Sequence, residues 1–227
     1  MRRRYEIRFC FFSRNFADID NDCDGVVDNG CDGGGCTQIF PASCPAITAV
    51  TDDFNTAADG PLPGCWFSPP TSPVFVQAQQ ACAHQQGIAF QHVAQASSVT
   101  VTFDFTASTA DGYEAGAILT SIDCTGTPEF ILIAGVAGPQ PHNLEVKFLS
   151  SGTVLQGTNF HELDGTYTIT ATLHTNGDVQ LSLQGEGISE SLNGNVGRAL
   201  EWTAVGTLAG RDPNGLTCFD NFELSSS

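Results

Sequence analysis

The sequence predicts an all-β protein folded as a two-sheet antiparallel sandwich of the jelly-roll type. Apolar and polar residues alternate in several runs, the polar ones are mostly Thr, Ser, Gln, Asn and Gly, and no stretch shows a convincing amphipathic helical period. A period of two places one face of a strand in the core and the other in water. About ten such strands in roughly 170 residues favour a sandwich. A barrel is the lesser alternative, because no repeating corner pattern occurs.

Four runs show this alternation most clearly, namely residues 99–106, 144–148, 166–173 and 178–184. Asn176 and Gly177 separate the last two, and an Asn-Gly pair between alternating runs is a strong hairpin signal. Further strands are expected near 74–79, 87–93, 115–122, 129–135, 202–208 and 216–224.

Composition divides the chain into three parts. Residues 1–16 begin with basic residues, but their apolar run is too short and too interrupted by charge for a signal peptide, so we interpret them as a disordered leader or a mis-called start of a longer exported protein. Residues 17–46 are rich in Asp, Cys and Gly and would need metals or disulfides to fold. Residues 52–224 carry the strands. No segment is long enough to be a transmembrane helix.

The charge of the chain excludes one class of partner. From residue 15 onward there are three basic residues against 24 acidic ones. Such a surface repels phosphate backbones, so nucleic-acid binding is not expected. The same surface attracts divalent cations.

The stretch "DIDNDCDGVVDNGCDG" (18–33) is the strongest motif in the chain. Its spacing matches the loop pattern D-x-[DN]-x-[DN]-G, in which alternate carboxylates surround a hard cation. The predicted calcium ligands are the carboxylates of Asp20, Asp22, Asp24 and Asp28 and the backbone carbonyl of Val26, arranged around the turn at Gly25. Cys31 stands where an EF-hand has its closing Glu, so the loop is not an EF-hand. The alternative is an acidic linker without metal.

This stretch resembles the short Asp- and Cys-bearing metal-binding motifs of bacterial surface proteins, which are similar to thrombospondin type 3 calcium repeats. The resemblance implies calcium as cofactor, an extracellular or cell-surface location, and a helix-free segment closed by disulfides.

Eight cysteines lie in the acidic body, an even number that is typical of a secreted disulfide framework and leaves Cys10 over. Zinc is disfavoured, because the spacing lacks paired knuckles and no histidine lies near. The pairs Cys23–Cys31, Cys36–Cys44, Cys65–Cys82 and Cys124–Cys218 are interpretations, since sequence does not fix connectivity.

The strand region opens with "DDFN" (52–55), closes with "CFDNFEL" (218–224), and contains the hairpin described above. These features resemble the concanavalin A-like and laminin-G-like jelly rolls of bacterial exported proteins. The resemblance implies a sandwich whose termini meet, with carbohydrate binding or, less often, glycoside cleavage.

Aromatic rings and paired acids are the candidate sugar-contacting groups. Trp66, Tyr113 and Trp202 could stack on sugar rings, although Trp202 also fits the core. Glu162 with Asp164, and Glu186 with Glu190, are carboxylate pairs of the kind that glycosidases use, but they lie where turns and loops are expected. Asp53 and Asp220 could share a structural ion if the termini meet, or could cap turns.

We therefore expect an exported calcium-binding, carbohydrate-binding or adhesion module without catalysis, with a glycan or cell-surface polysaccharide as partner. The alternatives are a glycoside hydrolase-like enzyme of the same fold and a purely structural surface spacer.

Overall fold

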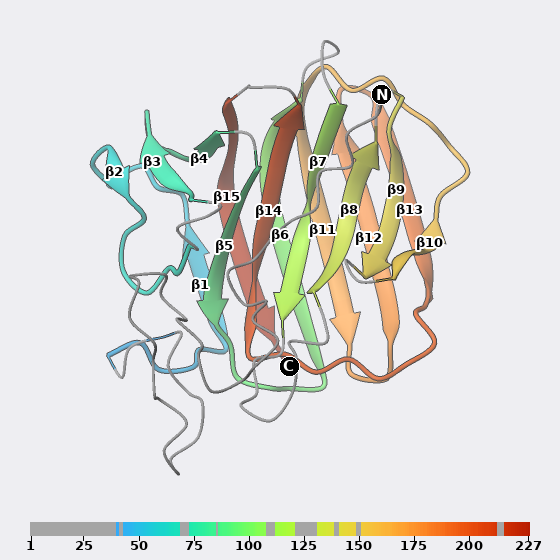
Figure 1. Ribbon diagram of the computed structural model, residues 1–227, viewed down its shortest axis with the longest axis horizontal. Coiled ribbons are helices and arrows are strands. Elements are labelled where there is room, and N and C mark those ends of the chain that lie inside the picture. The colour runs from blue at the N-terminus through green and yellow to red at the C-terminus, as the bar shows by residue number, and fades with distance from the viewer. Residues whose placement is uncertain are drawn as a thin grey trace, which may run out of the picture.

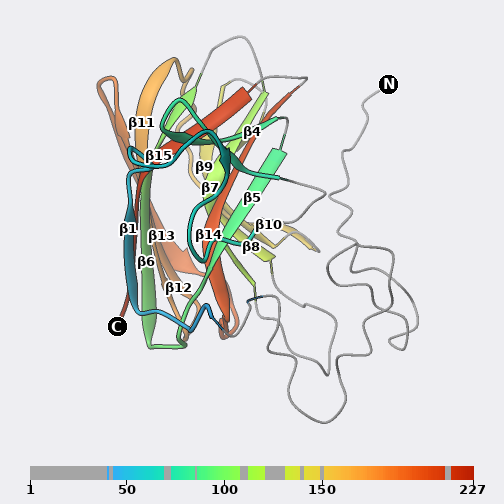
Figure 2. The same cartoon turned by 90° about the vertical axis from the view of Figure 1, so that its left-hand side faces the viewer.

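The computed structural model consists of two antiparallel β-sheets packed face to face. It describes residues 40, 43–68, 73–84, 86–107, 112–120, 131–138, 141–148, 151–212 and 216–227. No helix occurs in these ranges. Figure 2 shows the two sheets edge-on as two layers. The predicted all-β sandwich is thus confirmed.

The larger sheet has nine strands: β1 (Ala49–Asp52), β2 (Gly60–Pro61), β3 (Phe75–Gln77), β4 (Gln80–His84), β6 (Ser98–Ala107), β11 (Gly165–His174), β12 (Asp178–Gly185), β13 (Ile188–Asn195) and β15 (Leu216–Ser226). Their order is β13-β12-β11-β6-β15-β4-β3-β2, and β1 pairs with β15 off this path. Because β1 and β15 are register partners, the two ends of the sandwich meet as expected.

The smaller sheet has six strands: β5 (Gln86–His92), β7 (Gly112–Thr120), β8 (Ile131–Gly138), β9 (Asn143–Phe148), β10 (Gly152–Gln156) and β14 (Ala204–Asp212). Their order is β10-β9-β8-β7-β14-β5. All pairings between named strands are antiparallel in both sheets. In Figure 1 the smaller sheet lies nearer the viewer.

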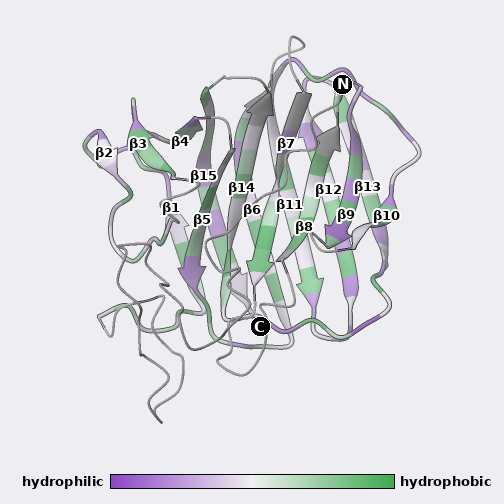
Figure 3. Cartoon of the chain, in the orientation of Figure 1, coloured by the Kyte–Doolittle hydropathy of each residue, from purple (hydrophilic) through white to green (hydrophobic). Residues whose placement is uncertain are grey.

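The core lies between the sheets and consists of the inward residues of the alternating runs. Phe103, Ile169 and Leu181 are fully or almost fully buried. Thr102 and Thr170 lie on the opposite face, where the Thr102 hydroxyl donates to the Thr170 hydroxyl at 3.2 Å. Figure 3 shows this as alternating hydrophobic and hydrophilic bands along the strands. The period-two pattern therefore positions the strands as the sequence predicts.

The predicted Asn-Gly hairpin joins β11 to β12. Gly177 has a φ of 91°, a backbone conformation that favours glycine, and its N–H donates to the carbonyl of His174 at 2.9 Å. The Asn176 side chain accepts the N–H of Asp178 at 3.0 Å and so closes the turn.

All ten predicted strands are present. The loop predicted around Glu186 and Glu190 is a turn at Glu186, but the prediction is wrong for Glu190. Residues from Ile188 onward form the edge strand β13, in which half-buried and exposed residues alternate strictly. Ile188, Glu190 and Leu192 share the half-buried face. The sequence does not predict this strand because only Ile188 and Leu192 show the alternation of apolar and polar residues.

A second, smaller apolar cluster covers the outer face of the six-stranded sheet at its β5 end. Phe40 stacks on the His92 ring with centroids 4.9 Å apart, and Phe67 packs on the same cluster, which includes Ile88 and Leu208. A disulfide between Cys44 and Cys65 fixes this covering segment.

The disulfides correct the predicted pairings. Cys44 bonds to Cys65, and Cys82 bonds to Cys218, so Cys36–Cys44, Cys65–Cys82 and Cys124–Cys218 are wrong. Local pairs were favoured because they are close in sequence. The fold instead places β4 beside β15 with Cys82 and Cys218 as register partners, 136 residues apart in the chain.

The predicted calcium loop lies outside the described residues, as do Cys23, Cys31, Cys36 and Cys124. Within the described ranges, no group of three or more His, Cys, Asp or Glu side chains is arranged to hold a metal ion. Those ranges also contain no helix that is long and apolar enough to cross a membrane.

Candidate functional site

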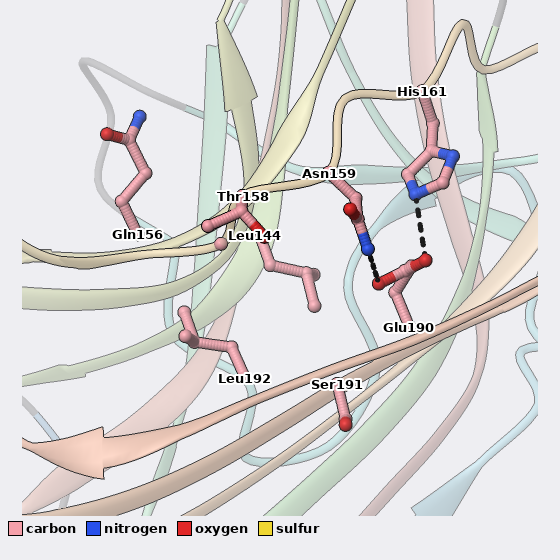
Figure 4. A pocket seen from close by; sticks show the side chains of 9 residues that line it. Leu144, Gln156, Thr158, Asn159, His161, Glu190, Ser191 and Leu192 are labelled. Atoms are coloured by element: carbon pink, nitrogen blue, oxygen red, sulfur yellow. Dashed lines mark hydrogen bonds and ion pairs between the residues drawn. The ribbon is translucent and has the colours of Figure 1, made fainter.

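A crevice of about 180 Å³ lies at one edge of the sandwich, between the loop that follows β10 and the edge strand β13. The strands β10 and β13 belong to different sheets and contact each other here, so the crevice is the seam between the two layers. Figure 4 shows the side chains that line it. Leu144 and Leu192 provide apolar surface, and the other side chains drawn are polar.

The loop of the crevice, residues 157–161, is held against β9 by backbone hydrogen bonds. Gly157 N–H donates to the Leu144 carbonyl at 2.8 Å, and His142 and His161 exchange two backbone bonds of 2.8 and 2.7 Å. The Asn143 side chain also donates to the Gly157 carbonyl at 3.2 Å. The loop is therefore anchored at both ends, which fixes the direction of the side chains between them.

Glu190 is the centre of the polar group in the crevice. The Asn159 amide donates to one carboxylate oxygen at 2.7 Å, and His161 Nε2 lies 3.4 Å from the other. The side chains of Glu190 and His161 are only 25% and 24% exposed (Figure 4). A carboxylate held in this way keeps lone pairs that can accept hydroxyl hydrogen bonds, and the amide offers both a donor and an acceptor.

Phe160 lies between Asn159 and His161 in the sequence, yet the residue is 58% exposed. Among the described residues, it and Val154 of β10 are the large hydrophobic residues that are exposed. A single exposed hydrophobic side chain is ordinary. Phe160 does not itself line the crevice, but it belongs to the loop whose neighbouring residues Asn159 and His161 do. The loop thus carries both an exposed ring and hydrogen-bonding groups.

The two tryptophans predicted as sugar contacts both pack against core residues. Trp202 is 1% exposed and belongs to the core, which leaves no face for a sugar. Trp66 donates its indole N–H to Asp52 at 2.9 Å and packs edge-on against Phe222 and at a tilt against Phe54. It therefore links β1 to the core. The side chain of Tyr113 lies outside the described part of the structure.

The structure places the predicted carboxylates in different surroundings. Glu162 and Asp164 are exposed in the loop before β11, and Glu186 lies in the turn between β12 and β13. Only Glu190 lines the crevice. Sequence reasoning missed Asn159 and Phe160. The signal that could have found the site is the I-x-E-x-L alternation of 188–192, which places Glu190 on the inward face between two apolar residues.

A second charged group lies on the outer face of the six-stranded sheet. Lys147 of β9 forms ion pairs with Glu114 of β7 and with Glu145, whose Oε1 is 3.2 Å away. Thr153 donates to the other oxygen of Glu145 at 3.1 Å. Burial alone would lower the pKa of Lys147, but the two carboxylates outweigh it and raise that pKa. The amine therefore stays protonated near neutral pH and is a poor general base.

A smaller crevice of about 90 Å³ lies on the larger sheet beside Asp104 and Asp220, which are register partners on β6 and β15. Asp104 accepts hydrogen bonds from Thr168 at 2.5 Å and from the Asn221 amide at 2.8 Å. Asp53 caps a turn by accepting the N–H of Asn55 at 3.1 Å, as the turn alternative for this residue predicts. These acids are close enough for Asp53 and Asp104 to contribute to a raised pKa of Asp220.

Several solved structures have a similar fold. The alginate lyase Aly36B matches with a TM-score of 0.56 and 10% identity, covering 80% of this chain and 98% of that one. The carbohydrate recognition domain of Emp47p matches with 0.53 and 11%, covering 83% and 97%. The winged bean acidic lectin complexed with methyl-α-D-galactose matches with 0.52 and 12%, covering 78% and 97%. No protein-family model and no curated protein matches the sequence.

At such identities the likeness shows the fold alone. The protein has the jelly-roll sandwich shared by this lectin, this carbohydrate recognition domain and this lyase, consistent with the predicted concanavalin A-like fold.

Proposed function

We propose that this protein is an exported, non-catalytic carbohydrate-binding module that binds glycan in the crevice between residues 157–161 and β13. The observation that carries the proposal is the Asn159–Glu190–His161 group that lines the crevice, in a loop that also carries the exposed Phe160. The ring would stack on the apolar face of a sugar, while the carboxylate and the amide would bind its hydroxyl groups. Two matching structures, a lectin and a carbohydrate recognition domain, support a glycan as the ligand class.

Export is supported by the disulfides Cys44–Cys65 and Cys82–Cys218, because such bonds form and persist in oxidising compartments. An extracellular or cell-surface location is thus part of the proposal, and a cell-surface polysaccharide is the proposed partner.

A glycan array tests the binding proposal. We expect binding by the wild-type protein and at least a tenfold loss in Phe160→Ala, roughly the effect of removing one stacked ring. Val154→Ala is the matched control, because it removes the other exposed hydrophobic side chain, which lies on β10 and not in the 157–161 loop. Absence of binding to any glycan, in calcium and in chelator, would reject the proposal, as would equal binding by Phe160→Ala and wild type.

We also propose that Asp20, Asp22, Asp24 and Asp28, with the carbonyl of Val26, bind one calcium ion. The support is the spacing of the motif. Calorimetry on Asp22→Ala and Asp24→Ala should show a large loss of calcium affinity, and unchanged affinity would reject the loop.

The sequence offered Glu162, Asp164, Glu186 and Glu190 to the enzyme alternative, whereas the structure brings together a different pair, Glu114 and Glu145, on one sheet face. Their shared ion pair with Lys147 opposes a role in which one of them must carry a proton. Release of reducing ends or unsaturated products from array-positive glycans, lost in Glu145→Gln, would instead establish catalysis.

A further inference from the structure

We infer that the crevice selects neutral glycans and discriminates against polyuronates. This inference rests on the proposed function and specifies the substrate class of the same site. It is drawn from the charges in and around the crevice, because a uronate differs from its neutral sugar mainly by one carboxylate.

The charged side chains that line the crevice are Glu190 and, when protonated, His161. Glu190 holds the Asn159 amide and lies within ion-pair distance of His161, so the one lining group able to become cationic is already beside a carboxylate. Glu162 and Asp164 follow in the same loop and are both exposed. The potential that a ligand meets at this edge is therefore dominated by negative charge.

The basic side chains that the structure describes are engaged elsewhere. Lys147 is paired with Glu114 and Glu145 on the face of the six-stranded sheet. The guanidinium of Arg198 lies over the Phe148 ring, 3.6 Å from its centroid. Neither residue lines the crevice. Recognition of a uronate carboxylate would call for such a cation, ideally a bidentate arginine.

A neutral sugar fits the same groups. Its hydroxyl groups can donate to the Glu190 carboxylate, which charge makes a strong acceptor, and its apolar C–H face can lie on Phe160. A carboxylate placed on the sugar ring would instead lie close to Glu190 and lose its hydration without gaining a partner.

Matched pairs of polysaccharides test the inference: a glucan, a mannan and a galactan, each compared with its C6-oxidised polyuronate form. Binding is measured by affinity electrophoresis and calorimetry at low and high salt, with wild type, Phe160→Ala, Glu190→Gln and Val154→Ala. We expect at least one neutral form to bind about tenfold or more tightly than its oxidised form at low salt. The ratio should shrink at high salt and in Glu190→Gln, which keeps the shape and removes the charge.

The two proposals fail in different ways. If the oxidised forms bind as tightly as the neutral ones and binding still falls in Phe160→Ala, the crevice is a glycan site but the inferred selectivity is wrong. If no form binds, or if Phe160→Ala matches Val154→Ala, the proposed function is wrong and the inference falls with it.

Discussion

On the outer face of the larger sheet, opposing interactions of Asp104 and Asp220 determine the pKa of Asp220. They are direct register partners, so their carboxylates lie side by side. Asp104 has two hydrogen-bond donors, Thr168 and Asn221. For Asp220, burial raises the pKa, Asp104 and Asp53 add to this effect, and the Asn221 N–H and the Gln80 side chain oppose it. The ionised form of Asp220 is therefore less stable, relative to the protonated form, in the folded protein than in the unfolded chain.

The predicted consequence is that Asp220→Asn stabilises the protein at neutral pH. A carboxyl whose pKa is raised by folding destabilises the folded state above that pKa, and this penalty disappears as pH falls towards the unfolded value of about 3.9. We expect a gain of about 0.5 kcal/mol at pH 7, small because solvent screens a half-buried group, and none at pH 3.

Asp178→Asn is the control with the opposite sign. Hydrogen bonds from Asn195 and Asn176 lower the pKa of Asp178, so its replacement should destabilise at pH 7 and destabilise less at pH 3. Urea denaturation at both pH values measures the two effects. A loss of stability in Asp220→Asn at pH 7 would show that another interaction holds this carboxylate as an anion.

Two glycine turns show how elements of the larger sheet are joined. Gly177, in the β11–β12 turn, and Gly187, in the β12–β13 turn, have φ values of 91° and 80°. Their surroundings differ. A Cβ at Gly177 would lie 2.2 Å from the Arg198 carbonyl, whereas a Cβ at Gly187 would meet nothing within 4 Å. The first turn is packed against the segment that leads to Trp202, where the Val196 N–H donates to the Gly177 carbonyl at 2.9 Å.

Gly187→Ala should therefore cost about 1–2 kcal/mol of unfolding free energy from backbone strain alone. Gly177→Ala should cost at least about 1 kcal/mol more, because the carbonyl of Arg198 must also move. Equilibrium denaturation of the two variants separates the terms. Equal losses would mean that the turn is not packed against residue 198 as described.

The disulfides act on different parts of the whole molecule. Cys82–Cys218 joins strands that are 136 residues apart, whereas Cys44–Cys65 closes a separation of 21 and fixes a covering segment on the smaller sheet. Restriction of the unfolded chain by a disulfide increases with the length of the closed loop.

Replacing both Cys82 and Cys218 by Ala should lower the unfolding free energy by about 5 kcal/mol, and replacing Cys44 and Cys65 by about 3 kcal/mol, in the chain-entropy account. Thermal and denaturant unfolding of the two double variants compares them. A larger loss of unfolding free energy from replacing Cys44 and Cys65 would show that the segment they fix contributes more to stability than chain entropy alone predicts.

Much of the fold could be predicted from the sequence because strands buried on one face carry an explicit period. The runs around Phe103, Ile169 and Leu181 and the turn at Gly177 are all confirmed. The edge strand β13 was not predicted, because an edge strand buries few apolar side chains and its alternating pattern depends on Ile188 and Leu192. The disulfide pairing was not predicted because it depends on topology, and no local sequence feature indicates that β4 lies next to β15.

The candidate site was less predictable than the fold. Glu190 is a candidate acid in the sequence. Its partners Asn159 and His161 follow a strand of the other sheet, and their contact with Glu190 depends on the fold because they are distant from it in the sequence. Tryptophan was favoured as the sugar-stacking residue, yet both tryptophans pack with core residues. The exposed ring belongs to Phe160, whose exposure depends on how the loop is anchored to β9.

The most direct test of the central claim is an amide NMR titration of the whole protein with the best neutral glycan from the array. The account predicts that shift changes concentrate in residues 157–161 and 189–192 and are lost in Phe160→Ala. Changes centred instead on the face of the six-stranded sheet around Glu114 and Lys147, with the crevice unperturbed, would contradict it.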